Sequence, residues 1–85
     1  MTYRVHVRVL PRQGLLDPQG QAVEHALAAL RFTDASNVHV GKAIELEIAA
    51  RSAAAAADRA RQMCDQLLAN PVIEDYEIVV EPASR

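Results

Sequence analysis

The sequence has little of what disulfide-stapled, membrane-spanning or secreted proteins need. Its 85 residues include one cysteine, three glycines, two tyrosines, one phenylalanine and no tryptophan. Cys64 has no second thiol with which to form an internal disulfide, so a reducing compartment is the simplest setting. No apolar run approaches the roughly 20 residues of a membrane helix, and no basic segment leads into an apolar one as in a signal peptide. We therefore expect a cytoplasmic protein.

A strong charge of one sign is also missing. Nine Lys and Arg against eleven Asp and Glu leave a net charge of −2, so we expect no nucleic-acid or membrane partner. What the chain does contain, 51% hydrophobic and 24% charged residues, is typical of one globular domain, which we place at residues 1–82 with a polar tail at 83–85. A domain of this size buries only about 60% of its chain's surface, which favours association.

The first part of the chain predicts a strand and then a helix. Between residues 3 and 9, apolar and polar residues alternate, which is typical of a half-buried strand. Asp17 and Pro18 predict a helix start, because Asp17 can accept from the first free amides and Pro18 loses no hydrogen bond there. The inward residues of this helix share helical spacing: Val23, Ala26, Leu27 and Leu30.

The rest of the chain predicts a hairpin, a long helix and a last strand. Two strand-like runs, 37–40 and 43–49, flank Gly41-Lys42, and a glycine in the first linking position suits a type II′ turn. Ser52 can cap a helix that Asn70-Pro71 ends. Alternation over 76–81 predicts the final strand. The inward residues of the long helix again share one face: Ala56, Ala57, Ala60, Met63, Cys64, Leu67 and Leu68.

This order of elements predicts an α+β fold in two layers. The expected βαββαβ arrangement is a ferredoxin-like-related antiparallel sheet with two helices on one face. In such a sheet the first strand lies between the third and the fourth. Opposite charges pair across strands, and here the outward residues of the first strand are basic while those of its neighbours are acidic. These are Arg4, His6 and Arg8 against Glu45, Glu47, Glu77 and Glu81.

No combination of residues points to catalysis or metal binding. His6, His25 and His39 lie on two predicted strands and a helix, without the close spacing of a zinc site. Cys64 lies on the inward helix face, which indicates a core residue and not a nucleophile. RNA recognition needs aromatic residues on the central strands, and a soft-metal carrier needs a C-x-x-C pair. We expect no catalytic residue, metal or cofactor on this chain.

Two segments carry residues that local structure does not explain. In Asp17-Pro18-Gln19-Gly20, capping accounts for the first two residues, but Gln19 and Gly20 are mediocre choices early in a helix. Close backbone approach by a partner and chance are equally good explanations. In Asn70-Pro71-Val72-Ile73, the last two residues place apolar groups in a surface connection that leads to Tyr76. Such exposure predicts packing or an interface.

Four blocks spread along the chain have a familiar combination of residues. They are Leu-Asp-Pro-Gln-Gly at 16–20, Ala-Val-Glu-His-Ala-Leu at 22–27, Val-Gly-Lys followed by Ile-Glu-Leu within 40–46, and Leu-Ala-Asn-Pro-Val-Ile-Glu-Asp-Tyr-Glu-Ile at 68–78. Together they resemble the PurS family, the small subunit of phosphoribosylformylglycinamidine (FGAM) synthase. The resemblance runs nearly end to end, so it is more specific than a single short motif.

The resemblance implies a non-catalytic subunit of an ATP- and glutamine-dependent ligase of de novo purine biosynthesis. That enzyme converts formylglycinamide ribonucleotide (FGAR), ATP and glutamine to FGAM, ADP, phosphate and glutamate. A PurS-like chain is expected to form a homo-oligomer, either a dimer or a dimer of dimers. It would join a PurL-like synthetase to a PurQ-like glutaminase and support ammonia transfer between them. ATP and Mg are then expected on the synthetase, with no cofactor on this chain.

The unexplained segments are the candidate subunit interfaces. The residues concerned are Asp17, Pro18, Gln19, Gly20, Asn70, Pro71, Val72, Ile73 and Tyr76. An edge strand or the open charged face is expected to pair with a second copy, because unpaired strand edges are templates for association. A different function remains as an alternative, an ACT-like regulatory module that dimerises around a small molecule such as an amino acid.

Overall fold

The structure is a computed structural model that describes residues 1–83. Its elements, in chain order, are β1 (Thr2–Pro11), α1 (Pro18–Ala29), β2 (Lys42–Ala49), α2 (Ala53–Met63), the π-helix η1 (Cys64–Leu68) and β3 (Glu74–Pro82). Residues 84 and 85 of the predicted polar tail lie outside the described residues.

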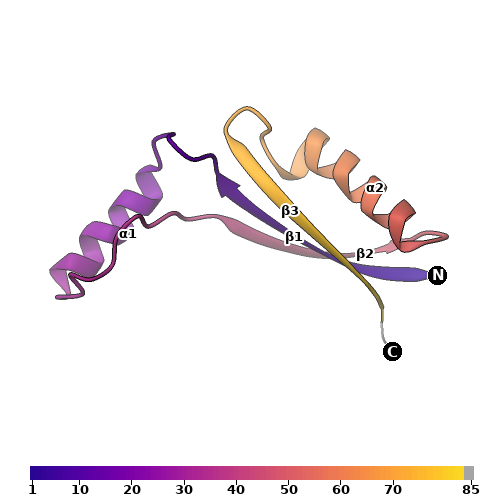
Figure 1. Cartoon of the computed structure of the whole chain (residues 1–85), viewed down its shortest axis with the longest axis horizontal. Coiled ribbons are helices and arrows are strands. Elements are labelled where there is room, and N and C mark those ends of the chain that lie inside the picture. Colours follow the sequence, from indigo (N-terminus) through magenta and orange to yellow (C-terminus); the bar gives the residue numbers. More distant parts are fainter. Residues whose placement is uncertain (84–85) are drawn as a thin grey trace.

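The strands form one antiparallel sheet in the order β2-β1-β3 (Figure 1). Val5 of the central strand pairs with Leu46 on one side and with Val80 on the other. The α+β class, the antiparallel sheet and the central position of the first strand are therefore confirmed. The helix α2 lies over one face of this sheet and leaves the other face open.

The core forms where the alternating residues of β1 meet the small residues of α2. Val5, Val7 and Val9 are buried beneath the helix, as are Ala56 and Ala60 on the helix itself. Alanine on this inner face lets the helix lie close to the sheet. Cys64 is also fully buried, as predicted for a core residue, and this burial raises the pKa of its thiol.

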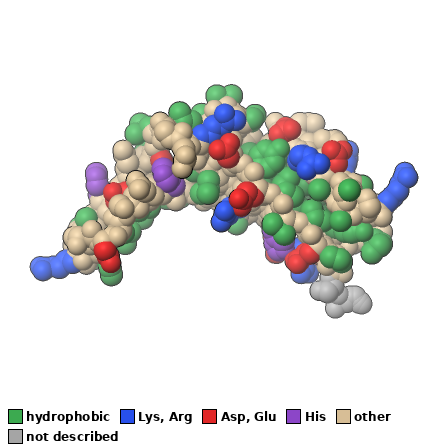
Figure 2. Space-filling view, viewed as in Figure 1, with side chains coloured by type: hydrophobic (Ala, Val, Ile, Leu, Met, Phe, Trp, Pro, Cys, Tyr) green, Lys and Arg blue, Asp and Glu red, His purple; other side chains and the backbone are tan. Residues whose placement is uncertain are grey.

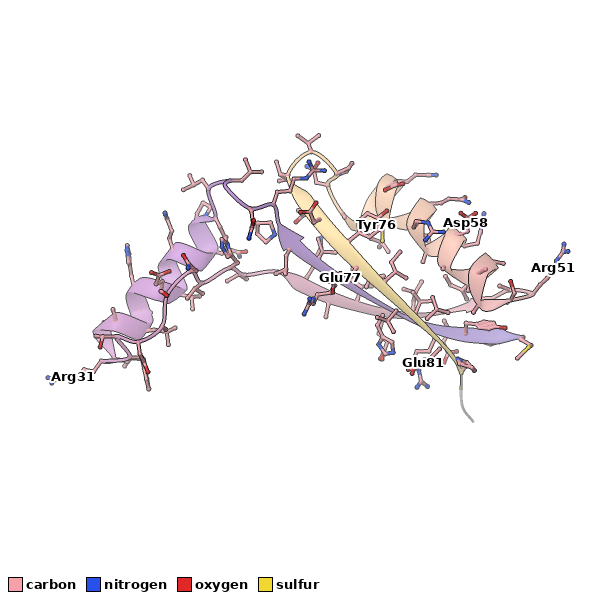
Figure 3. All side chains as sticks on the ribbon, in the orientation of Figure 1. Arg31, Arg51, Asp58, Tyr76, Glu77 and Glu81 are labelled. Atoms are coloured by element: carbon pink, nitrogen blue, oxygen red, sulfur yellow. The ribbon has the colours of Figure 1, made fainter. Side chains whose placement is uncertain are left out.

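The open face of the sheet carries the predicted opposite charges. Arg8 donates to Glu77 across β1 and β3 at 2.8 Å. His6 lies between two carboxylates, 3.1 Å from Glu45 on β2 and 2.8 Å from Glu81 on β3. Glu77 and Glu81 project from the side of β3 opposite α2 (Figure 3), and basic and acidic side chains lie side by side over the sheet in Figure 2. Pairing across strands is therefore confirmed for His6 and Arg8 with their three acidic partners. Arg4 lies opposite Glu47 and Glu81 in the register, but no ion pair joins it to either within the described residues.

The predicted strand at 37–40 and its hairpin are wrong. β2 begins at Lys42, and the residues before it lie against α1 and not against a strand. The sheet therefore has three strands, and the elements follow one another along the chain as β-α-β-α-β. Gly41 does not have the positive φ that a type II′ turn requires. It is needed for another reason, because a Cβ at this position would collide with the carbonyl oxygen of Val9.

The prediction that both helices cover one face of the sheet is also wrong for α1. This helix extends beyond the end of the sheet, which makes the molecule an arch with extents of 50 × 31 × 15 Å (Figure 1). The connection after β1 carries α1 past the sheet, and residues 38–40 instead contact the N-cap residue Asp17 and Glu24 in the second turn of the helix. Its narrow apolar stripe is therefore poorly covered, and Leu30 is 68% exposed.

The end of the second helix differs from the expected α-helical register. Ser52 caps α2 as predicted, by accepting from the amide of Ala55 at 3.1 Å. From Cys64 onward the helix is a π-helix, which takes more residues per turn and so shifts which side chains face inward. Leu67, predicted to face the core, is 81% exposed, whereas Leu68 packs against the core.

Candidate subunit interface

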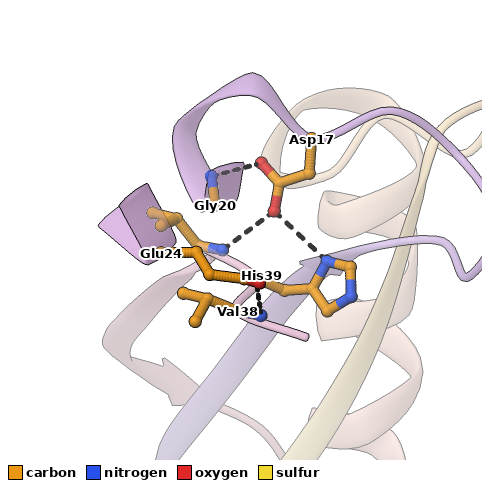
Figure 4. Close-up of polar contacts among 6 residues, drawn as sticks. Asp17, Gly20, Glu24, Val38 and His39 are labelled. Carbon is orange, nitrogen blue, oxygen red and sulfur yellow. Dashed lines mark hydrogen bonds and ion pairs between the residues drawn. The ribbon is translucent and has the colours of Figure 1, made fainter. Parts of the chain in front are cut away.

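The carboxylate of Asp17 joins the start of α1 to the segment before β2 (Figure 4). Oδ1 accepts from the amide of Gly20 at 3.0 Å, which is the predicted N-cap. Oδ2 accepts from the amide of Val40 at 3.1 Å and lies 3.3 Å from Nδ1 of His39. Although the residue is charged, it is only 9% exposed. We call Asp17, Gly20, Glu24 and residues 38–40 the Asp17 cluster.

The electrostatics of the cluster favour the ionised form of Asp17. The amide of Gly20 has the largest effect and lowers the pKa of the carboxyl group, while burial acts in the opposite direction. The Val40 amide and the His39 side chain lower this pKa further. A carboxylate that accepts from backbone amides is stabilised in its charged form, so Asp17 is a charged structural contact at neutral pH.

Close backbone approach explains Gly20, and the approaching backbone belongs to the chain itself. A Cβ on this residue would collide with the carbonyl oxygen of Val38 and with the Asp17 carboxylate. Beside it, Oε1 of Glu24 accepts from the amide of Val38 at 3.2 Å. Asp17 and Gly20 therefore make their close contacts within this chain, where they join the start of α1 to residues 38–40.

The second predicted segment is a compact turn organised by Asn70. Oδ1 of Asn70 accepts from the amide of Val72 at 3.1 Å, and its carbonyl oxygen accepts from the amides of Ile73 and Glu74. The Asn70 amide in turn donates to the Glu74 carboxylate at 2.7 Å. With its polar groups satisfied locally, the turn directs the side chain of Val72 outward, where it is 75% exposed.

Arg12, at the end of β1, fixes this turn against the rest of the molecule. Its amide donates to the carbonyl oxygen of Ile73 at 2.9 Å, and its guanidinium donates to that of Pro71 at 2.6 Å. Nε of Arg12 also lies 3.4 Å from the carboxylate of Asp75. These contacts place the turn beside the connection that leads into α1.

A cleft of about 450 Å³ lies between the two predicted segments. It brings together most of the first segment and part of the second, although about 55 residues separate them in the chain. Its lining comprises Pro11, Leu15, Leu16, Asp17, Pro18, Gln19, Val40, Ile73 and Glu74. The walls are mainly apolar and two carboxylates lie at the site, so the cleft suits an apolar side chain or short segment of a partner.

Sequence reasoning missed Leu15 and Leu16 in this cleft. Leu16 is 74% exposed, and both residues lie in the connection between β1 and α1. The signal that singled out Val72 and Ile73, two adjacent apolar residues in a surface connection, is present here as well. The same criterion, applied to the whole sequence, would have singled out Leu15 and Leu16 as well as Val72 and Ile73.

Tyr76 and Gly20 do not line the cleft. Tyr76 faces α2 from the start of β3 (Figure 3), and its hydroxyl donates to Asp65 of η1 at 3.0 Å. Partial burial, followed by the hydrogen bond to the Asp65 carboxylate, raises the pKa of the Tyr76 hydroxyl. The tyrosine thus joins β3 to η1.

Neither a metal-binding cluster nor a membrane-spanning helix is found within the described residues. Within residues 1–83 no group of three or more His, Cys, Asp and Glu side chains is placed to hold a metal ion. No helix in that range is both long enough and apolar enough to cross a membrane.

Comparison with known proteins identifies the family. A family model described as PurS, phosphoribosylformylglycinamidine (FGAM) synthase, matches residues 4–82. This chain belongs to the PurS family. The resemblance seen in the four sequence blocks is thereby confirmed.

Individual PurS proteins match over nearly their whole length. The PurS subunit from Bacillus subtilis is 43% identical over 84 residues, with 93% of each chain covered. The crystal structure of PurS from Methanocaldococcus jannaschii matches with a TM-score of 0.85 at 35% identity, covering 96% of this chain and 99% of that one. A chain in the structure of PurLQS from Thermotoga maritima matches with a TM-score of 0.86 at 28% identity, covering 95% and 99%.

Proposed function

We propose that this PurS chain is the small, non-catalytic subunit of FGAM synthase and joins a PurL-like synthetase to a PurQ-like glutaminase. The observation that carries the proposal is the match to PurS across residues 4–82, together with the similar chain in the PurLQS structure. The enzyme it serves is an ATP- and glutamine-dependent ligase of de novo purine biosynthesis. The alternative of an ACT-like regulatory module is not favoured by these relatives.

Within this complex, the chain's contribution is a surface for assembly. The cleft lined by Leu15, Leu16 and Ile73 exposes apolar groups beside the charges of Asp17 and Glu74. Apolar centres with a polar rim are typical of protein interfaces. We place the synthetase contact, or a contact with another protomer, at this cleft and at the neighbouring Val72.

The chemistry belongs to the partner subunits in this proposal. ATP and Mg bind to the synthetase, and no cofactor binds to this chain. By holding synthetase and glutaminase together, the chain supports the transfer of ammonia from one to the other. The complex works in the cytoplasm, where a free thiol such as that of Cys64 stays reduced.

Reconstitution of the activity tests this role. FGAM formation is measured with the matching synthetase and glutaminase subunits, with and without this chain, first with glutamine and then with ammonia as the nitrogen source. We expect the glutamine-dependent rate to require the chain and the ammonia-dependent rate to depend on it much less. If both rates are equal with and without the chain, the proposed role is wrong.

A further inference from the structure

Within residues 1–83, α2 packs against one face of the sheet and no helix lies over the other (Figure 1). We call this second face the open face. It consists of the alternate side chains of each strand that do not point into the core, within residues 4–10, 43–47 and 75–81. A whole sheet face without a layer over it offers a large surface to a partner.

The negative charge of the molecule is concentrated on the open face. Among the described residues, it carries two arginines, Arg4 and Arg8, against four glutamates, while Asp75 at its end is paired with Arg12. The glutamates are Glu45, Glu47, Glu77 and Glu81. With His6 neutral, two positive against four negative charges leave −2, which equals the net charge of the whole chain.

The carboxylates of the open face keep the capacity to bind a further cation. The side chains of Glu45 and Glu77 are mostly exposed in their ion pairs with His6 and Arg8. An ionised carboxylate has about four lone-pair sites for hydrogen bonds. The ion pairs within the sheet therefore do not use up its acceptors.

The open face is hollowed around an exposed apolar side chain. Val79 is 60% exposed and lines a hollow of about 500 Å³. The lining of this hollow combines Ala43 and Val79 with the charged Glu45 and Glu77. A second hollow, of about 200 Å³, shares Arg8 and Glu77 with the first and continues toward the end of β1. Apolar side chains among charged ones are typical of protein interfaces.

We infer that the open face binds a basic surface of a partner protein. Lysine and arginine side chains of the partner pair with Glu45 and Glu77, and an apolar side chain between them enters the hollow at Val79. Opposite charge attracts such a surface and fixes its orientation. A second copy of this chain, one of the occupants expected from the sequence, is disfavoured because two open faces of equal negative charge repel each other.

The proposed function indicates which partner carries the basic surface, and to that extent the inference rests on it. A subunit that joins a synthetase to a glutaminase needs a separate surface for each. The cleft at Leu16 and Ile73, where β1 ends and β3 begins, is assigned to the synthetase or to another protomer. The open face is therefore assigned to the glutaminase.

The two surfaces differ in the forces that hold a partner. Interactions between exposed charges are screened by salt, with a Debye length of about 8 Å at physiological ionic strength. Burial of apolar groups, as in the cleft, is not weakened in this way. We therefore expect added salt to weaken the binding of the glutaminase and to leave the binding of the synthetase nearly unchanged.

Neutralisation of two carboxylates tests the inference. Glu45→Gln combined with Glu77→Gln keeps the side-chain shapes and removes two negative charges from the open face. Asp34→Asn combined with Asp58→Asn is the matched control, because both residues are exposed, lie outside the sheet and change the net charge equally. The glutaminase is titrated by calorimetry into each chain bound to the synthetase. We expect its dissociation constant to rise at least about tenfold for the open-face variant and to stay within about twofold for the control.

Equal affinity of the glutaminase for both variants would overturn the inference. So would a loss of synthetase binding or of self-association that is confined to the open-face variant, because the occupant would then be another protein. The wild-type chain provides a measurement that needs no variant. A glutaminase affinity that does not fall between about 0.05 M and about 0.5 M salt is also contrary to the inference.

The reconstituted activity separates this inference from the proposed function. If the glutamine-dependent rate requires the chain and the open-face variant binds the glutaminase as wild type does, only the inference is refuted. If the glutaminase binds the open face in a salt-sensitive way and the chain has no effect on that rate, the proposed function is refuted and the inference stands.

Discussion

Nε2 of His6 lies 2.8 Å from the carboxylate of Glu81, on the neighbouring strand of the open face. Nδ1 of the same ring lies 3.1 Å from Glu45 on the other neighbouring strand. A neutral imidazole has a single N–H, so only the protonated ring can donate to both carboxylates. One side chain thus connects β2, β1 and β3 on the face that α2 does not cover.

His6→Ala is expected to return the pKa of Glu81 toward its ordinary value. The hydrogen bond from His6 is the largest cause of the lowered pKa of this carboxyl group. Since the folded pKa lies below the unfolded one, the contribution to stability is present above the unfolded pKa and is lost as the pH falls through the folded pKa. NMR titration of Glu81 measures the effect, and thermal unfolding should separate variant from wild type at neutral pH more than in acid.

His25→Ala is the matched control for that experiment. His25 is exposed on α1, and no carboxylate pairs with it within the described residues. Its removal should leave the Glu81 titration unchanged. An unchanged titration in His6→Ala itself would show that the bridge is not formed in solution.

Gly20→Ala is expected to destabilise the protein, against the trend of helix propensity. Alanine inside a helix normally gains about 1 kcal/mol over glycine. Here the added Cβ collides with the Val38 carbonyl oxygen and the Asp17 carboxylate, and overpacking of this kind costs about 2 kcal/mol. Urea unfolding gives the sign of the change. Gln21→Ala, on the exposed side of the same turn, serves as the control and should be neutral or slightly stabilising.

Leu68→Ala and Leu67→Ala test the register of the π-helix. Leu68 packs against the core, so its truncation should lower the free energy of unfolding by about 1–2 kcal/mol. Leu67 is exposed, and its truncation should change that free energy by less than about 0.5 kcal/mol. Chemical denaturation of both variants decides the matter. The reverse ranking would mean that the helix continues in the α-helical register.

Val72→Ser combined with Ile73→Ser is expected to weaken assembly and leave the fold intact. Both side chains are largely exposed, and Ile73 lines the cleft. Burial of two such side chains by a partner contributes about 2–3 kcal/mol, so we expect the affinity for the synthetase to fall at least about thirtyfold in titration calorimetry. Leu67→Ser is a comparable apolar loss at an exposed site outside the cleft. Equal affinities for both variants would contradict the role of the cleft.

Features set by neighbouring residues were predictable from the sequence. The alternation over Tyr3 to Val9 and the caps at Asp17 and Ser52 depend on local geometry, and all are present in the structure. The central position of β1 followed from the expected sheet arrangement, and the basic residues of β1 agree with acidic residues on both neighbouring strands. The family followed from four blocks spread over the chain.

What could not be predicted depends on contacts between distant segments. Residues 38–40 alternate like a strand, but the sequence does not say that side chains of Asp17 and Glu24 take the place of a neighbouring strand. In the π-helix the inward position passes from Leu67 to Leu68, and no local signal in the sequence marks this change. The cleft forms where the pairing of Pro11 with Glu74, together with the contacts of Arg12, brings the turn at Pro71 to the end of β1.

The central position of β1 also determines when the sheet can be completed during synthesis. Residues 2–11 leave the ribosome before the other two strands, yet half of their strand pairing waits for residues 74–82. Contacts that span nearly the whole chain close a large loop and slow folding. Until β3 emerges, one edge of the strand that is most buried in the folded protein stays open to other chains. The nascent protein is therefore most prone to aggregation just before its last strand arrives.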